Sequence, residues 1–254
     1  MINNKYEDLI SEFKSITKQR WLKSVNNGTN GVGLTFEKLI SKEPDSMFFP
    51  DYYGTEIKCT TRFSGYPITL FTIAFDGETF YEMNRLLEKY GKQDTIYKDK
   101  KILISNLAVN KKILVNNKYY FEIKLDYCNK KLFLAIYDIN KNFIEKSSYV
   151  DFSSLKTRLE LKLSRLALVY ASKKRIENDY YYRYYKMIIY ELKSFETFLE
   201  LLNKNIIKVE IVGRVSRSGS EKGRQKNKNL VFKLPKENIT YLFNEILILD
   251  LNKK

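Results

Sequence analysis

The chain has 254 residues, and 44% of them are hydrophobic, which is enough to bury a substantial core and argues against a disordered protein. Its 45 basic and 30 acidic residues give a net charge of +15, which favours a polyanionic partner such as nucleic acid. Histidine is absent, which excludes histidine-dependent triads and histidine-ligated metal sites.

Hydrophobic periodicity alternates between helical and strand spacing, so a single α/β domain is expected over residues 1–254. In chain order, the first half predicts a helix over 6–16, a glycine-rich turn over 27–33, a short helix over 36–40, strands over 55–61 and 68–73, and a helix over 81–87. The second half predicts strands over 101–109, 119–127 and 131–137, a helix over 153–164, a buried strand over 165–171, a helix over 195–202, and strands over 206–212 and 230–234. The tyrosine-rich segment 179–185 is interpreted as ordinary strand sequence, not as a base-stacking surface.

Two features bear on the compartment. The only cysteines, Cys59 and Cys128, are too few for a disulfide framework and favour a reducing compartment, so a cytoplasmic protein is expected. No apolar run approaches the ~18 residues that span a bilayer, so no membrane association is expected.

The most informative stretch is residues 49–58, which reads FPDYYGTEIK. Side chains alternate along a strand, so Glu56 and Lys58 are expected on one face and Ile57 in the core. Gly54 permits the chain to fold back, which would bring Asp51 toward Glu56. Two carboxylates and an ammonium around one point suit Mg²⁺ and phosphodiester hydrolysis. The alternative is a solvated strand face with an ion pair, which is the commoner origin of such spacing.

The sequence resembles the MvaI/BcnI family of restriction endonucleases, and the front half of the pattern is shared with MutH and the Sau3AI group. The resemblance is carried by the segments GVGLTFE at 31–37, PD at 50–51, GTEIK at 54–58 and LFT at 70–72. It continues less specifically through YGKQD at 90–94, FSSL at 152–155, KRIEN at 174–178 and IKV at 207–209.

The resemblance implies a PD-(D/E)XK nuclease core, a mixed central sheet flanked by helices, with an appended DNA-recognition subregion. It implies metal ligation at Asp51, Glu56 and Ile57, and it places Lys58 beside the attacking water. Glu37 matches a further acidic residue that would act as a ligand or orienting base, unless it is simply a solvent-facing helical residue. Catalytic elements are expected mainly in 28–110 and DNA-recognition elements mainly in 150–240.

Base reading is expected in the polar connection between the last two predicted strands. The basic candidates there are Arg214, Arg217, Lys222, Arg224, Lys226 and Lys228. In a groove, arginine would pair with guanine and asparagine or glutamine with adenine. The alternative is a solvated loop that binds phosphates without reading sequence. The family pattern carries histidines in this region and this chain has none, so a recognition sequence is not carried over.

These observations lead to a type II restriction endonuclease that cleaves double-stranded DNA with Mg²⁺. The resemblance implies a monomer with a cognate DNA methyltransferase as a functional partner, not a stable subunit. A MutH-like strand-nicking repair endonuclease, a non-catalytic basic DNA-binding protein and a ribonuclease are the alternatives. Lys100 or Lys101 is a candidate second active-site lysine of the MutH type.

Overall fold

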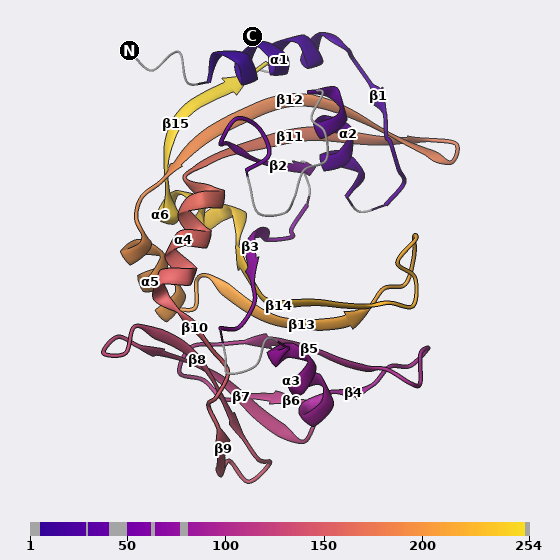
Figure 1. The fold of residues 1–254 in the computed structure, drawn as a ribbon. Helices are drawn as coiled ribbons and strands as arrows, with labels where there is room; N and C mark the ends of the chain where they lie inside the picture. Colours follow the sequence, from indigo (N-terminus) through magenta and orange to yellow (C-terminus); the bar gives the residue numbers. More distant parts are fainter. Residues whose placement is uncertain (1–5, 29, 41–49, 62–63, 77–80, 252–254) are drawn as a thin grey trace. The chain divides into compact units, whose positions relative to one another are not determined.

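The computed structural model describes residues 6–28, 30–40, 50–61, 64–76 and 81–251 (Figure 1). The chain divides into two compact units, each assembled from segments far apart in sequence. The first unit comprises Met1–Tyr66, Glu160–Lys193 and Thr240–Lys254, and the second comprises Pro67–Leu159 and Ser194–Ile239. The prediction of one domain over 1–254, with catalytic elements in 28–110 and recognition elements in 150–240, stays a prediction.

The first unit is built on a mixed sheet in the order β1-β12-β11-β2, with β15 paired to residues 186–192 of β12. Its strands are β1 (Leu22–Lys23), β2 (Glu56–Thr61), β11 (Arg165–Ile176), β12 (Asp179–Leu192) and β15 (Phe243–Asp250). The β11–β2 pair is parallel and the other pairs are antiparallel. Its helices are α1 (Glu7–Lys18), α2 (Gly31–Leu39), the short α6 (Ile239–Leu242) and the end of α4 (Phe152–Leu163). The predicted mixed sheet flanked by helices is confirmed.

Helices α1 and α2 cover one face of this sheet through a common apolar core. The helices contribute Leu9, Phe13, Ile16, Val32 and Phe36, and the strands contribute Ile57, Ala167, Val169, Tyr182 and Tyr184. The buried Tyr184 hydroxyl donates a hydrogen bond to the Val32 carbonyl at 2.7 Å, which fixes α2 against β12. The interpretation of the tyrosine-rich segment as strand sequence therefore holds for Tyr182 and Tyr184.

The start of α2 differs from the predicted glycine turn. The turn was expected to run through Gly33, whereas the helix begins at Gly31. A Cβ at Gly31 would lie 2.6 Å from the Asn26 carbonyl oxygen and 2.7 Å from Ser24 Oγ. Gly31 is thus required by close packing against the preceding loop, and it does not interrupt the helix.

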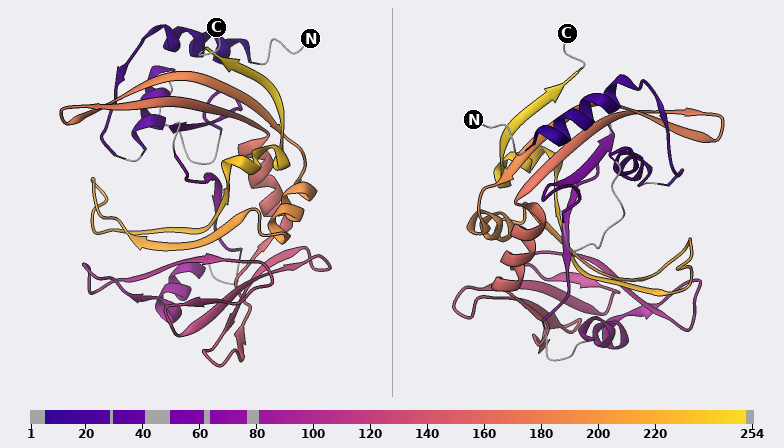
Figure 2. Two further views of the ribbon diagram at one scale, coloured as in Figure 1. Left: turned by 180° about the vertical axis from the view of Figure 1, so that it is seen from behind. Right: turned by 45° about the horizontal axis from the view of Figure 1, so that its top comes forward.

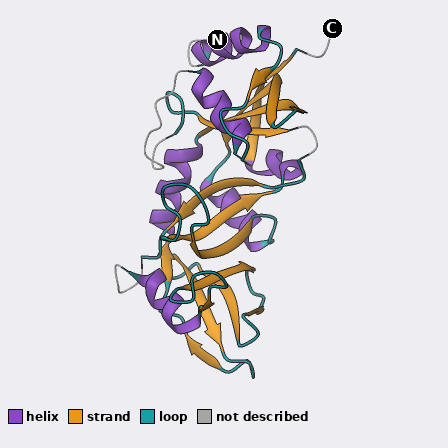
Figure 3. Ribbon diagram, turned by 90° about the vertical axis from the view of Figure 1, so that its right-hand side faces the viewer, coloured by secondary structure: helices purple, strands orange, loops and turns teal. Residues whose placement is uncertain are grey.

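The second unit contains two antiparallel sheets (Figure 3). One has the order β10-β8-β7-β6, with β9 paired to β8, and its strands are β6 (Ile113–Val115), β7 (Tyr119–Asp126), β8 (Lys131–Tyr137), β9 (Phe143–Glu145) and β10 (Tyr149–Asp151). The other has the order β3-β14-β13-β5-β4, and its strands are β3 (Ile68–Ile73), β4 (Lys92–Gln93), β5 (Lys101–Leu107), β13 (Lys208–Val215) and β14 (Gln225–Leu234). Its helices are α3 (Glu82–Tyr90) and α5 (Phe195–Asn203), with a 3-10 turn at Lys236–Asn238 and most of α4.

Most predicted elements lie where the periodicity placed them. The main omissions are β12 beyond its tyrosine-rich start, β15 and the short edge strands. In the described part of the chain no helix is long and apolar enough to cross a membrane.

Candidate active site

A tight turn at Tyr53 and Gly54 folds the chain back onto the start of β2. Both residues have positive φ, at 42° and 79°, as a two-residue hairpin turn of the I′ type requires. Asp51, just before the turn, therefore lies beside β2, where its Oδ2 accepts a hydrogen bond from the Ile57 backbone N–H at 2.9 Å. A Cβ at Gly54 would also lie 2.6 Å from the Arg165 guanidinium, so both backbone and space favour glycine here.

Glu56 and Lys58 project from the same face of β2, as the strand period predicted. Lys58 Nζ donates a hydrogen bond to Glu56 Oε1, and the Ile57 side chain points to the opposite face of the strand, into the core. Glu56 is only 1% exposed, whereas the Lys58 side chain is 28% exposed. The carboxylate is thus buried, with the Lys58 ammonium on its more open side.

A second lysine, which sequence reasoning missed, contacts the same carboxylate. Lys162, near the end of α4, places Nζ 2.9 Å from Glu56 Oε2, and its side chain is 12% exposed. Among the described residues no donor makes a well-directed hydrogen bond to Oε2, so this contact is mainly electrostatic. A buried carboxylate is costly unless its charge is compensated, and two ammonium groups supply that compensation here.

Glu37 and Asp51 both lie close to this cluster. Burial raises the pKa of the Cys59 thiol well above its ordinary value, the Glu37 and Asp51 carboxylates raise it further, and Lys58 lowers it. Since such effects fall off with distance, Glu37 and Asp51 both lie near Cys59 of β2. Glu37 is half-buried on α2. Asp51, Glu56 and Lys58 are therefore brought together at the start of β2, and Glu37 lies on α2 within electrostatic range of Cys59.

Lys100 and Lys101, the candidates for a second active-site lysine, have their contacts within the second unit. Lys100 Nζ donates to the Gly223 carbonyl at 2.6 Å. Lys101 Nζ donates to the Glu88 carbonyl at 2.6 Å and to its Oε1 at 2.8 Å. The second lysine in contact with Glu56 is Lys162, which comes from a helix far along the sequence.

The donor set suits a hard divalent cation. Glu56 supplies a buried carboxylate, Asp51 a second carboxylate beside it, and Ile57 can contribute only its backbone carbonyl. Within the described ranges no group of three or more acidic or cysteine side chains is close enough to form a metal cage. Mg²⁺ does not require one, because it binds through one or two carboxylates and keeps several waters.

The Glu-Ile-Lys tripeptide of β2 occurs a second time in the chain, and comparison of the two copies shows which contacts are specific to the candidate active site. Glu122, Ile123 and Lys124 on β7 repeat the Glu-Ile-Lys of β2, and Lys124 Nζ lies 2.9 Å from Glu122 Oε1. There the other carboxylate oxygen accepts a hydrogen bond from the Tyr137 hydroxyl at 2.8 Å. The second copy is an ordinary strand ion pair, and only the first copy has Asp51 and Lys162 in contact with it.

Comparison with known proteins identifies the family. The sequence profile of the MvaI/BcnI restriction endonuclease family matches residues 10–243. The chain belongs to this family. It is therefore a type II restriction endonuclease with a PD-(D/E)XK-type fold.

Solved structures of a family member agree with this assignment. The complex of restriction endonuclease MvaI with its cognate DNA substrate is 26% identical, with a TM-score of 0.85 over 98% of this chain and 99% of that chain. MvaI in the absence of DNA is 25% identical, with a TM-score of 0.59 over 97% and 98%. No curated protein sequence matches the chain.

In this restriction endonuclease the basic connection of the second unit forms a β-ribbon. Strands β13 and β14 extend into the connection, with Arg214 opposite Lys226, and residues 216–224 close the ribbon. Five of the six predicted DNA-binding residues are exposed: Arg214, Arg217, Lys222, Arg224 and Lys226. Lys228 is half-buried, and burial lowers the pKa of its ammonium.

Arg217 differs from its neighbours because it anchors a loop. Its guanidinium donates to both oxygens of the buried Asp94 carboxylate, at 2.8 and 2.5 Å. Asp94 Oδ1 also accepts the backbone N–H groups of Ile96 and Tyr97 at 2.8 and 2.9 Å. These hydrogen bonds, led by Arg217, hold the Asp94 pKa well below its usual range. Arg217 thus contributes to the structure of the ribbon whether or not it contacts DNA.

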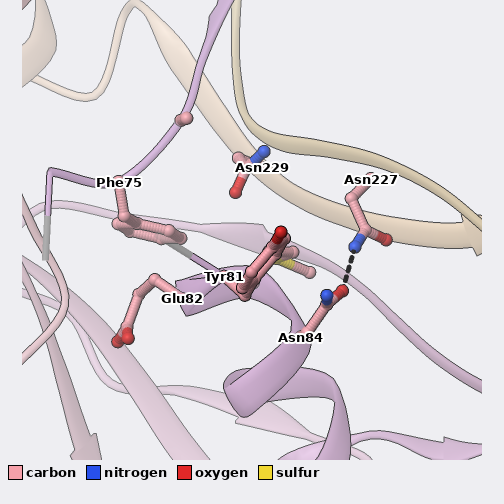
Figure 4. A pocket seen from close by; sticks show the side chains of 8 residues that line it. Phe75, Tyr81, Glu82, Asn84, Asn227 and Asn229 are labelled. Carbon is pink, nitrogen blue, oxygen red and sulfur yellow. Dashed lines mark hydrogen bonds between the residues drawn. The ribbon is translucent and has the colours of Figure 1, made fainter. Parts of the chain in front are cut away.

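A pocket of about 170 Å³ lies beside the ribbon within the second unit. It is lined by Ala74, Phe75, Tyr81, Glu82, Met83, Asn84, Asn227 and Asn229. Asn227 donates from its amide to Asn84 Oδ1 at 2.8 Å, and Figure 4 shows this pair close to the Tyr81 ring. Three amide side chains thus gather at the base of the ribbon.

Proposed function

We propose that this restriction endonuclease hydrolyses DNA with Mg²⁺ held by Asp51, Glu56 and the backbone carbonyl of Ile57. The supporting observation is the buried Glu56 carboxylate, compensated by two ammonium groups and lying beside Asp51. The cation would polarise the scissile phosphodiester and acidify a water. Cleavage would leave a 5′-phosphate, as the family resemblance implies.

Three side chains of the protein have further roles beside the cation. Lys58, on the open side of Glu56, orients the attacking water and offsets negative charge that develops on the phosphate. Lys162 holds the Glu56 carboxylate in place from the other side. Glu37 orients the water or adds negative charge for the cation, because it is half-buried within electrostatic range of Cys59 on β2.

The proposal is tested by digesting plasmid DNA of known sequence with Mg²⁺, with Ca²⁺ and with a chelator. We expect fixed ends at one short sequence, 5′-phosphorylated, in Mg²⁺ alone. Scattered ends would contradict sequence-specific cleavage. Equal cleavage in the presence of the chelator would contradict the metal requirement. Parallel digestion of RNA separates a ribonuclease from a DNA enzyme.

Strand cleavage is expected to proceed through a nicked intermediate. The chain carries one set comprising Asp51, Glu56 and Lys58, and one such site cannot cut two antiparallel strands in a single pose. A monomer must therefore rebind or slide between cuts, which electrostatic contacts to phosphates permit. Supercoiled plasmid with one site should pass through open circles before becoming linear, at a rate first order in enzyme.

A symmetric dimer is the competing arrangement, since it would place two active sites on one duplex. Sedimentation with a short cognate duplex in Ca²⁺ separates the two. A complex of two chains per duplex, together with linear product that appears without open circles, would contradict the monomer. A MutH-type enzyme would instead stop at open circles.

The β13–β14 ribbon is proposed to read bases, and Arg224 gives the cleanest test. Its side chain is 72% exposed and is paired only with the neighbouring Glu221, whereas Arg217 anchors Asp94. Arg224→Ala should weaken cognate binding by about 1–3 kcal/mol and random-sequence binding much less. Arg217→Ala should also lower the melting temperature. Equal losses of Arg224→Ala on both DNAs would mean that the ribbon binds phosphates only.

The cellular setting is proposed as the cytoplasm, with a separate DNA methyltransferase that protects host sites. Both Cys59 and Cys128 are free, as a reducing compartment favours.

A further inference from the structure

The outer part of the β11–β12 hairpin carries a basic and aromatic surface in the first unit. Beyond Ala171, β11 is paired with β12 alone, and the opposing part of β12 is otherwise bordered only by the two-residue β1. Both views of Figure 2 show the free end of the hairpin extending past the neighbouring strands. We call Trp21, Lys174, Tyr181 and Arg183 the hairpin surface. Lys173 lies opposite Tyr182 and faces the other way, toward the side that α1 and α2 cover.

Strand register places part of this surface on the same face of the sheet as the active site. Leu166 lies opposite Glu56 and Leu168 opposite Lys58 in the parallel pair, and opposite residues share a face. Alternation along β11 then brings Lys174 to that face. Across the hairpin, Lys174 is opposite Tyr181, which therefore faces the same way. The face that carries the catalytic carboxylate thus continues outward into a basic surface.

The two adjacent lysines of the outer hairpin, Lys174 on the hairpin surface and Lys173 on the other face, lie against aromatic rings and not against carboxylates. Lys174 Nζ lies 4.3 Å from the Trp21 ring centre and 6.0 Å from that of Tyr181, and Lys173 Nζ lies 3.5 Å from that of Tyr180. In the part of the chain that the structure describes, neither lysine forms an ion pair. Cation–π contacts of exposed lysines orient the ammonium without neutralising it, so the positive charge is kept.

The acids at the hairpin tip do not cancel this charge. Asp179 is paired with Lys23 at 2.5 Å, which leaves Glu177 as the one exposed acid of the turn. Arg175 and Arg183 are exposed on the flanking strands. The hairpin therefore presents a net positive arm whose natural complement is a polyanion.

We propose that the hairpin surface binds the phosphate backbone of duplex DNA outside the recognition sequence. Lys174 is six residues along β11 from the residue opposite Lys58, which corresponds to about 20 Å of strand. For a duplex that runs along the hairpin, at about 3.4 Å per base pair, this distance corresponds to about six base pairs from the scissile phosphate. This proposal rests on the proposed DNA cleavage. It adds a contact with DNA that flanks the recognition sequence and that does not depend on the flanking sequence.

Duplex phosphate fits better than an unpaired base. Lys174 Nζ already occupies one face of the Trp21 ring, at 4.3 Å from its centre, so that face is not open for a base to stack on. The charged heads, by contrast, are exposed or half-buried at the surface. Backbone contacts of this kind position a protein on DNA without reading bases.

Trp21 is the only tryptophan in the chain, so its fluorescence reports directly on this surface. We expect a 40-base-pair duplex of arbitrary sequence, added in Ca²⁺, to change Trp21 emission in parallel with the anisotropy of labelled DNA. The double variant Lys174→Ala/Arg183→Ala, which removes the two positive charges on the same face as Glu56, should weaken binding and reduce the salt dependence of log K by about two. Site-specific cleavage in Mg²⁺ is scored separately, so loss of the flanking contact is distinguished from loss of the nuclease.

The matched control is Lys111→Ala/Lys112→Ala in the second unit. These are two exposed lysines, and Lys112 Nζ lies 3.7 Å from the centre of the Tyr137 ring, a cation–π contact like that of Lys174. Both double variants remove the same charge, so only a local contact makes them differ. Equal salt dependence in the two variants, or Trp21 emission unchanged while anisotropy reports binding, would overturn the proposal. A stronger Trp21 response to single-stranded than to duplex DNA would replace phosphate binding by base stacking.

Discussion

Replacing Lys58 by alanine is expected to lower the rate of DNA cleavage by about 10²–10³-fold or more. DNA affinity and the melting temperature should stay close to those of the unchanged protein. The ammonium lies on the open side of the buried Glu56, where it acts on charge that develops in the transition state. Asp51→Asn and Glu56→Gln should have the same consequence, because each removes a carboxylate charge proposed to hold Mg²⁺. Single-turnover cleavage in Mg²⁺ and anisotropy in Ca²⁺ measure the two effects separately.

The chain supplies its own control in the second Glu-Ile-Lys tripeptide. Lys124→Ala breaks an ion pair of the same residues at the same spacing, 2.9 Å between Lys124 Nζ and Glu122 Oε1. It should leave cleavage unchanged, since neither residue belongs to the proposed metal site and the buried Glu122 carboxylate keeps its hydrogen bond from Tyr137. Near-normal cleavage by the Lys58→Ala protein, or equal losses in the two variants, would contradict the assignment of the active site.

This repetition also shows what sequence alone could predict about the site. The tripeptide carries little information by itself, because at β7 it forms only a strand ion pair and a hydrogen bond to Tyr137. The functional copy is marked by its neighbours in sequence, Asp51 and the turn at Gly54. Both lie within seven residues of Lys58, so local rules of strand alternation and turn geometry were sufficient to place them together.

Lys162 could not be found in this way. On α4 the buried stripe runs through Leu155, Leu159 and Leu163, and the helical period assigns Lys162 to the side of that stripe, where solvated lysines are common. Its contact with Glu56 joins positions more than a hundred residues apart. Only the path of the chain between α4 and β11 brings them together.

The β11–β12 hairpin illustrates a second limit. The apolar run that predicts a strand ends at Ala171, yet the ladder continues to Ile176. Backbone hydrogen bonds across the hairpin continue without an apolar face, so the hydrophobic pattern underestimates the length of the strand. The tyrosines were predicted as strand residues, but which of them are buried depends on α2: Tyr184 contacts its backbone, whereas Tyr181 lies beside Lys174.

Lys162→Met is expected to lower the maximal cleavage rate by about 10²-fold while lowering the Mg²⁺ concentration required for half-maximal rate. The two effects have different origins. Lys162 holds the Glu56 carboxylate in position, so its loss slows the reaction. Its ammonium also lies 2.9 Å from an oxygen of a proposed metal ligand, so its loss removes a positive charge that opposes cation binding. Titration of Ca²⁺ binding by calorimetry gives the second effect independently of cleavage.

A lower cleavage rate combined with a lower Mg²⁺ requirement distinguishes a residue that positions Glu56 from one that only stabilises the fold. A variant that merely disturbed the packing of α4 would need more Mg²⁺, not less, and would bind Ca²⁺ more weakly. Lys156→Met on the same helix is the control, because its side chain is exposed and it should change neither quantity. Thermal unfolding of both variants checks that the fold is kept. An unchanged rate, or a raised Mg²⁺ requirement for Lys162→Met, would show that the contact with Glu56 does not support catalysis.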